Sequence, residues 1–216
     1  MVTGKTATNE PTGVSPDISA EIARRLGVNV EYVTYPDPGT LGDAALLDEW
    51  DIGNIGAEPQ RAENISFSAA YCEIEATYLL PAGSLIRDIG EVDQPGKRIA
   101  TKGRAAYGLW LENNLKHAEL VRTDSLDESF DVFVAKDLDA LAGLRPRLIS
   151  DLEQLQGARI LAGSFSVVQQ AVGTPKKNVA GALWLRAVVE ELKASGFVAK
   201  LIKKHDVKGL SVAPSS

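Results

Sequence analysis

Strand-like and helix-like segments alternate along almost the whole chain, and this order restricts the fold more than any other feature. The clearest strand patterns are 29–35, 51–55, 98–101 and 118–122, and helical patterns stand between them. A strand, a helix and a further strand form a βαβ unit, which builds a mostly parallel sheet flanked by helices. The sequence therefore predicts an α/β fold.

The sequence predicts where the first helix begins and ends. Residues 1–14 are polar and rich in Gly, Thr and Pro, which indicates a loop. Ser15 is expected to cap the helix, Pro16 suits the first helical position, and Gly27 should end it. The other expected elements are helices at about 40–49, 105–115, 126–135, 146–155 and from 179 onward with a break near 195–196, and strands at 138–142, 159–162 and 167–172.

Two extended segments divide the chain into two α/β blocks. Residues 77–81 are apolar and run into a turn at 81–84 that is a candidate hinge, and a second crossing is expected near 167–175. We predict one lobe from 1–82 with 173–216 and another from 83–172. Open α/β sheets bind ligands at the carboxyl ends of their strands, so the expected ligand site is the cleft between the lobes.

Charge and composition argue against several functions. The 216 residues carry a net charge of −6, which disfavours nucleic acid or an anionic membrane as a partner of the whole surface. One cysteine allows no intrachain disulfide, and two histidines provide no zinc-site spacing. No apolar run is long enough for a membrane span, and the residues after Met1 do not follow a signal-peptide pattern.

Several ordered stretches carry a family resemblance. They are 13–18 (GVSPDI), 21–27 (EIARRLG), 50–53 (WDIG), 58–63 (EPQRAE), 65–68 (ISFS) with Tyr71, 139–141 (DAL), 169–173 (QQAVG) and 190–196 (EELKASG). Together they resemble the bacterial extracellular solute-binding proteins of family 3, the amino-acid-type receptors of ABC transporters. The resemblance extends over residues 13–214.

The resemblance implies a two-lobed, type II periplasmic-binding-protein-like fold with a two-segment hinge. It also implies a receptor that captures a small solute and presents it to the membrane subunits of an ABC importer, at an extracytoplasmic location and without a cofactor. In the family, a strand precedes the N-terminal loop, and nothing before Val14 has that character. We therefore expect an incomplete first lobe, whose gap another segment or chain could fill by self-association.

Arg61 is the strongest candidate for ligand binding. By resemblance it is the arginine that holds the ligand carboxylate, and a guanidinium can form two parallel charge-assisted bonds to such a group. The alternative is a surface arginine paired with Glu58. In the second lobe, the resemblance assigns ligand contact to the loop before the helix at 105–115, where this chain has Arg104 and Ala105. A helix start binds anions, but Arg104 could equally be a solvated loop residue.

Four further residues complete the expected site. Asn54 and Glu58 stand at or just after the end of the strand at 51–55, and Gly56 offers only backbone where relatives often have a hydroxyl group. Gln169, at the second crossing, could bond to ligand or could satisfy backbone groups between the lobes. Glu58 could also serve only as the partner of Arg61.

The residues after the strand at 138–142 bear on ligand choice. Amino-acid binders of this family usually have an acidic residue there that holds the ligand ammonium, and this chain has Leu144 followed by Arg145. This change favours a ligand with a carboxylate and no ammonium, such as an organic or aromatic acid, over an ordinary amino acid.

Two other functions remain open from the sequence. The fold also hosts a cyclohexadienyl dehydratase, but Glu58 is the only obvious carboxylate in the expected site, and no nucleophile with histidine or phosphate-binding loop is present. We therefore expect no enzyme activity. A sensor or interaction module, including a degenerate copy that no longer binds ligand, is the other alternative.

Overall fold

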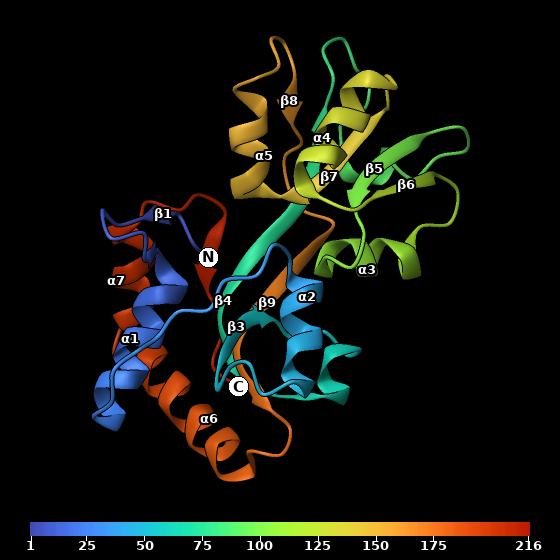
Figure 1. Cartoon of the computed structure of the whole chain (residues 1–216). Helices are drawn as coiled ribbons and strands as arrows, with labels where there is room; N and C mark the ends of the chain where they lie inside the picture. The colour runs from blue at the N-terminus through green and yellow to red at the C-terminus, as the bar shows by residue number, and fades with distance from the viewer. The chain divides into compact units, whose positions relative to one another are not determined.

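The computed structural model describes residues 1–216, which divide into two compact units (Figure 1). Unit 1 contains residues 1–73 and 169–216, and unit 2 contains residues 74–168. The chain passes between them twice, within strands β4 and β9. The sequence-based division placed these passages later, at 82 and 172.

The elements follow one another in a mixed α/β order. The helices are α1 (Val14–Leu26), α2 (Pro38–Asp43), α3 (Ala106–Asn114), α4 (Leu126–Ala135), α5 (Arg145–Leu152), α6 (Val179–Ala194) and α7 (Phe197–Lys204). The strands are β1 (Gly4–Lys5), β2 (Pro11–Thr12), β3 (Gly53–Gly56), β4 (Ile65–Leu80), β5 (Arg98–Lys102), β6 (Glu119–Thr123), β7 (Ala140–Leu144), β8 (Arg159–Ile160), β9 (Ser166–Pro175) and β10 (Leu210–Val212). Short 3₁₀ turns η1 (Ala44–Leu46), η2 (Arg61–Glu63) and η3 (Ile89–Glu91) stand between them.

Unit 1 packs helices α1, α6 and α7 beside its strands. Helix α7 contacts both α1 and α6, and the strand β3 pairs antiparallel with β9, with Gly53 opposite Gly173. The buried face of α1 is formed by Val14, Ile18 and Ile22, which recur at helical spacing. Gly27 ends α1 with a positive φ of 68°, as the sequence predicted.

The predicted cap of α1 is wrong. The helix begins at Val14, Gly13 is the N-cap without a side-chain bond, and Ser15 lies inside the first turn. The Ser15 hydroxyl is buried and bonds to the Tyr71 hydroxyl at 2.7 Å, and the amino group of Met1 also donates to it. A tertiary partner on β4 therefore uses the hydroxyl that local sequence assigned to capping.

The predicted strand at 29–35 is also wrong. The segment has no regular secondary structure and pairs with no strand, and its Val30 and Val33 are 37% and 52% exposed. The strand β3 stands at the end of the sheet, with β9 as its one neighbour. The alternating pattern is present, yet a strand forms only with a hydrogen-bonding partner.

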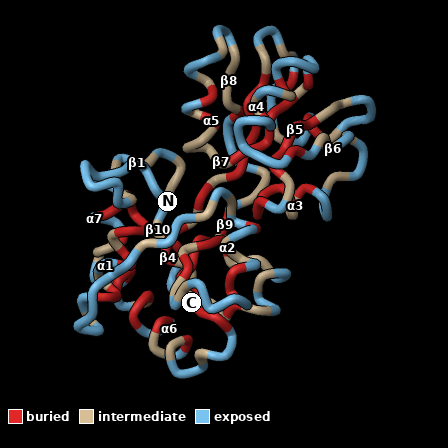
Figure 2. The backbone as a smooth tube through the Cα atoms, in the orientation of Figure 1, coloured by how far each residue is buried: buried red, intermediate tan, exposed pale blue.

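Unit 2 is built around β5, which pairs in parallel with both β6 and β7. Strand β7 pairs antiparallel with β4, with Ala76 opposite Leu144, and the short β8 also pairs antiparallel with β4. The sheet is therefore mixed, and its parallel part follows the predicted β–α alternation. Its apolar core consists of Leu79, Ala100, Phe133, Leu138, Leu141 and Leu148. Much of β5 and β7 is coloured as buried in Figure 2.

The remaining sequence-based elements match in kind. Helices α3 to α5 and strands β5 to β9 fall within a few residues of the predicted ranges, and the break at 195–196 separates α6 from α7. The loop at 1–14 contains the β1–β2 hairpin, in which Gly4 stands opposite Thr12. No helix combines the length and apolar composition needed to cross a membrane.

We expect acid to remove part of the stability of α1 through Glu21. Arg24 and Arg25 donate to its carboxylate at distances of 2.7–2.9 Å and lower its pKa to about 2. A lowered folded-state pKa stabilises the protein above the ordinary value of about 4.5, and this gain is lost as the pH falls toward 2. The variant Glu21→Gln should be less stable than wild type in urea unfolding at pH 7.

The difference in the free energy of unfolding between Glu21→Gln and wild type should become smaller as the pH falls from 4.5 to 2. The exposed Glu153 forms no ion pair, so Glu153→Gln serves as the matched control and should show little difference at any pH. If the difference in the free energy of unfolding between Glu21→Gln and wild type stayed constant from pH 7 to pH 3, the stabilising role assigned to the contacts of Glu21 with Arg24 and Arg25 would be contradicted.

Candidate functional site

The predicted ligand residues of unit 1 lie around the end of β3. The Ala57 amide donates to the Gln169 carbonyl at 2.8 Å, so the chain beyond β3 continues beside β9. A turn then leads into η2, because the Arg61 amide donates to the Glu58 carbonyl at 3.0 Å. The structure thus brings Gly56, Glu58, Arg61 and Gln169 into one neighbourhood from two distant parts of the sequence.

Arg61 is held by the backbone of this neighbourhood. Its Nη1 donates to the Gly56 carbonyl at 2.9 Å, and the side chain is half-buried. Helix α2 passes beside it, since a Cβ at Gly42 would lie 3.9 Å from the Arg61 Cδ. An arginine fixed by a carbonyl in this way has a defined orientation before any anion arrives.

Glu58 is the acidic group next to Arg61. Burial raises the pKa of its carboxyl group, and the nearby positive charge of Arg61 opposes this rise without cancelling it. Burial disfavours the charged form of a carboxyl group, whereas an opposite charge favours it. The local environment therefore keeps Glu58 easier to protonate than an exposed glutamate.

Asn54 and Gln169 each have a polar partner that the sequence did not indicate. Asn54 Nδ2 donates to Ser19 Oγ at 2.8 Å, while its Oδ1 is buried and has no partner. Gln169 Nε2 donates to Glu73 Oε1 at 2.7 Å. Ser19 lies on α1 and Glu73 on β4, so only the tertiary fold brings them to these residues, and no local motif marks them.

The predicted residues of unit 2 lie between β5 and α3. Arg104 is exposed and has a positive φ of 59°, while Ala105 is buried and forms the N-cap of α3. The loop is fixed by its neighbours, because the Gly103 amide donates to the Thr123 carbonyl at 3.0 Å and Lys102 Nζ donates to the Gly103 carbonyl at 2.7 Å. The nearby hydroxyl of Thr101 is buried without a partner.

Arg145, which the sequence linked to ligand choice, has several acceptors within unit 2. Its Nε bonds to the Glu75 carboxylate, and its Nη2 donates to the Gly163 carbonyl at 2.7 Å. Leu144 is the last residue of β7 and pairs with Ala76. Arg145 therefore fastens β4 and the 161–163 loop to the start of α5.

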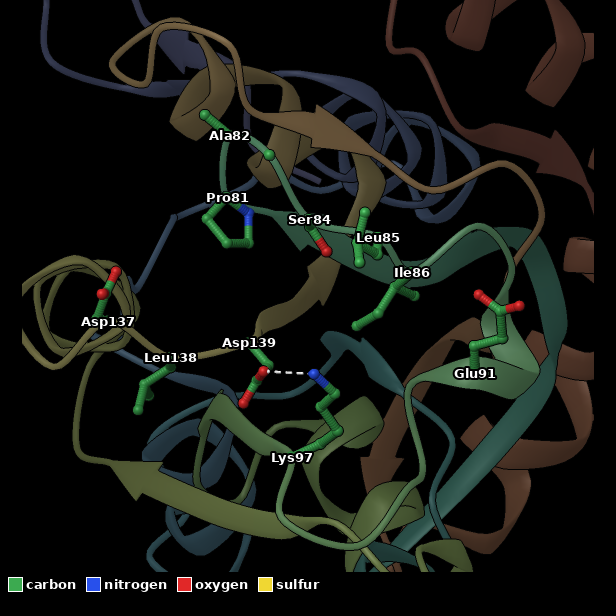
Figure 3. A pocket seen from close by; sticks show the side chains of 11 residues that line it. Pro81, Ala82, Ser84, Leu85, Ile86, Glu91, Lys97, Asp137, Leu138 and Asp139 are labelled. Atoms are coloured by element: carbon green, nitrogen blue, oxygen red, sulfur yellow. Dashed lines mark hydrogen bonds and ion pairs between the residues drawn. The ribbon is translucent and has the colours of Figure 1, made fainter.

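A separate pocket of about 480 Å³ lies in unit 2 (Figure 3). Residues of the 81–86 turn line it together with Lys97 and Asp139, whose Nζ and Oδ1 atoms are 2.9 Å apart. Asp139 also accepts the Arg98 amide at 2.9 Å, and these bonds lower its pKa. None of the predicted ligand residues lines this pocket, and Lys97 and Asp139 form an ion pair with each other in it.

Comparison of the chain with known proteins identifies its family and its fold. The profile of the bacterial extracellular solute-binding proteins, family 3, matches residues 3–207. No curated protein matches the sequence.

Solved structures resemble the chain over nearly its full length. A substrate-binding protein of an amino acid ABC transporter is 21% identical, with a TM-score of 0.76 over 94% of this chain and 92% of the other. The GluR0 ligand-binding core in complex with L-glutamate is 22% identical, with a TM-score of 0.77 over 94% and 93%. A solute receptor for L-cysteine from Neisseria gonorrhoeae is 18% identical, with a TM-score of 0.78 over 95% and 85%. These likenesses confirm the predicted two-lobed α/β fold of the type II periplasmic-binding-protein kind.

Proposed function

Because the chain belongs to the bacterial extracellular solute-binding proteins of family 3, we propose that it binds a small carboxylate-bearing solute as the receptor of an ABC importer. The proposal assigns the carboxylate to Arg61. The observation that carries it is the bond between Arg61 Nη1 and the Gly56 carbonyl, which orients the guanidinium beside the end of β3. A guanidinium with a fixed orientation can meet a carboxylate with two parallel bonds.

The other predicted residues receive supporting roles in this proposal. Asn54, Glu58 and Gln169 are assigned polar contacts to the solute, and Gly56 is assigned a backbone contact. In unit 2 the proposal assigns contacts to Arg104 and to the backbone at Ala105, because the first amides of a helix attract anions. The burial that raises the pKa of Glu58 also suits a carboxyl group that donates a bond when protonated.

We propose an organic or aromatic acid as the solute, ahead of an amino acid. Leu144 stands where amino-acid binders usually carry an acidic residue, and the adjacent Arg145 is positively charged and bonded to Glu75. An ammonium group would therefore lack a counter-charge at this position. Among the similar structures are a complex with lysine, a complex with L-glutamate and a solute receptor for L-cysteine, and this makes an amino acid the natural comparison ligand.

The proposal includes an extracytoplasmic location and membrane subunits of an ABC importer as partners, both of which follow from the family. It includes no enzyme activity. One similar structure is an ancestral amino-acid-binding protein described as a precursor of cyclohexadienyl dehydratase. Glu58 could supply one acid or base for such chemistry, but among the predicted site residues no second carboxylate joins it.

Thermal unfolding with and without ligands tests the proposal. The panel contains dicarboxylates, aromatic acids and amino acids. A solute at about 100 times its Kd stabilises the folded state by about 2.7 kcal/mol, which raises the Tm of a chain of this size by roughly 5–10 °C. A rise with acids that lack an ammonium group is the expected result. A stronger rise with amino acids would contradict the assigned solute class, and a cooperative transition that no acid shifts would contradict ligand capture.

A further inference from the structure

The outward side of helix α6 in unit 1 is apolar over its first half. Val179 and Leu183 are 65% and 62% exposed, and Ala180 and Ala187 are exposed as well. Exposed and buried stretches alternate along α6 in Figure 2. The opposite side of the helix is buried and consists of Ala182, Leu185, Val188, Val189, Leu192 and Lys193. We call Val179, Ala180, Leu183 and Ala187 the α6 face.

The composition of the α6 face is unusual for the outside of a helix. The solvent side of a surface helix normally carries charged and polar side chains, whereas all four residues of the α6 face are apolar. The exposed Arg186 stands at one edge of the face, and its Nε donates to the Phe67 carbonyl at 3.3 Å. This bond directs the guanidinium toward its own chain and away from the apolar stripe.

More exposed apolar residues lie near the start of α6. Leu46 and Leu47 are both exposed. They precede Asp48, which forms an ion pair with Lys177, two residues before Val179. The two leucines therefore lie close to the α6 face. Neighbouring exposed apolar side chains on a folded protein indicate contact with another surface.

The spacing of the α6 face suits a second copy of the same helix. Val179, Leu183 and Ala187 are four residues apart, so they form one stripe along the helix. In an antiparallel pair with a two-fold axis at Leu183, the two Leu183 side chains meet. Val179 of each copy then faces Ala187 of the other, because both lie four residues from Leu183. A large side chain thus meets a small one on each side of the axis.

The charges at the two ends of the stripe have opposite signs. Lys176 stands seven residues before Leu183, and Glu190 stands seven residues after it. The same two-fold axis therefore brings Lys176 of one copy near Glu190 of the other, twice in the pair. A parallel pair would bring like charges together instead. The antiparallel order also places the positive end of each helix dipole near the negative end of the other.

Both charged groups have capacity for a partner on a second copy. Lys176 Nζ has no carboxylate partner and donates only to the carbonyls of Ala62 and Glu63, at 3.1 and 3.3 Å. Glu190 Oε1 lies 2.8 Å from Lys193 Nζ, whereas its Oε2 accepts no hydrogen bond. A lysine from a second copy could therefore bond to Oε2 without breaking the existing contact.

We propose that the α6 face binds the α6 face of a second copy of this chain, in an antiparallel pair with two-fold symmetry. A two-fold dimer requires a self-complementary surface, because the same patch serves both partners. The net charge of −6 on each copy opposes association, but the α6 face itself carries no charge and is flanked by both signs. The face of one helix is smaller than the roughly 800 Å² per partner of a stable complex, so the dimer is reversible.

Sedimentation equilibrium of the full chain tests the proposal. Concentrations from micromolar to millimolar should show a monomer and a dimer in equilibrium, and no larger species, because a two-fold contact closes on itself. Leu183→Glu places two like charges at the axis and should raise the dissociation constant of the dimer by roughly tenfold or more. Leu183 is exposed, so the variant should fold, which circular dichroism would check. A chain that stays monomeric throughout would overturn the proposal.

Leu85→Glu is the matched control for Leu183→Glu. It makes the same change at an exposed leucine of unit 2 and should leave the dissociation constant unchanged. Equal weakening by the two variants would overturn the proposal, because it would reflect only the added negative charge. A dimer that persists in Leu183→Glu would place the contact elsewhere on the chain and would also overturn it.

Charge reversal tests the antiparallel order. Lys176→Glu and Glu190→Lys each bring like charges together in the pair, and each should raise the dissociation constant by roughly three- to tenfold. The double variant restores opposite charges and should return the constant to within about threefold of wild type. A double variant that is as weak as the two single variants would overturn the proposal.

Cross-linking locates the contact at Leu183. The variant Leu183→Cys should form covalent dimers with a short bis-maleimide reagent, whereas Leu85→Cys should not. The native Cys72 is buried and does not compete. Equal cross-linking of the two variants would overturn the proposal. The dimer should persist in Arg61→Ala, and Leu183→Glu should bind solute as wild type does, so failure of the proposed solute site and failure of this dimer are distinguishable.

Discussion

Replacing Arg61 with alanine is expected to raise the Kd for the bound carboxylate by about one to two orders of magnitude. Hydrogen bonds to a charged group contribute about 1.5–3 kcal/mol, and the variant removes the guanidinium that the Gly56 carbonyl orients. Arg61→Lys should recover part of the affinity, because an ammonium keeps the charge but cannot form the parallel pair. Isothermal titration calorimetry with the best acid from the panel measures both constants.

Arg186 provides the matched control for Arg61. It is an exposed arginine of α6 in the same unit, and its Nε donates to the Phe67 carbonyl at 3.3 Å. Arg186→Ala removes the same charge and should leave the Kd within about twofold, because exposed charges contribute little. Wild-type affinity in Arg61→Ala would refute its assigned role, provided that circular dichroism shows a folded variant.

Replacing Leu79 with alanine is expected to lower the free energy of unfolding by about 2–5 kcal/mol. Leu79 lies on β4 in the core of unit 2 and is 0% exposed, so truncation loses apolar burial and leaves a cavity among tightly packed neighbours. Urea unfolding followed by circular dichroism measures the change.

Leu85 provides the matched control for Leu79, because the same leucine-to-alanine substitution there removes an exposed side chain. It lies in the same unit and is 88% exposed, so Leu85→Ala should change the free energy of unfolding by no more than about 0.5 kcal/mol. Comparable losses in Leu79→Ala and Leu85→Ala would mean that the core of unit 2 is not where the structure places it.

Local sequence signals were sufficient for most of unit 2 and failed at specific places in unit 1. The ranges of α4 and β5 were predictable because capping, apolar spacing and strand propensity all act within a few residues, as at Ser125, whose hydroxyl accepts the Glu128 amide at 3.0 Å. The segment 29–35 has equally good strand character, but whether it pairs depends on what lies next to it in space. Ser15 likewise looks like a cap until Tyr71 is brought to it from β4.

The candidate site shows the same limit. The chain order around 54–61 let the sequence place Asn54, Gly56, Glu58 and Arg61 near the end of one strand. The bond from Arg61 to the Gly56 carbonyl, the partner Ser19 of Asn54 and the partner Glu73 of Gln169 depend on tertiary packing. A single sequence contains no signal for such pairings, because each residue alone is compatible with many partners.

The single cysteine of the chain gives β4 a natural chemical reporter. Cys72 is fully buried, and burial raises the pKa of its thiol to about 12, so the reactive thiolate is suppressed in the folded protein. A thiol reagent can therefore modify the native chain only when the strand around Cys72 opens. Since the chain has no other thiol, the rate of modification measures how often this one strand opens, without an introduced label.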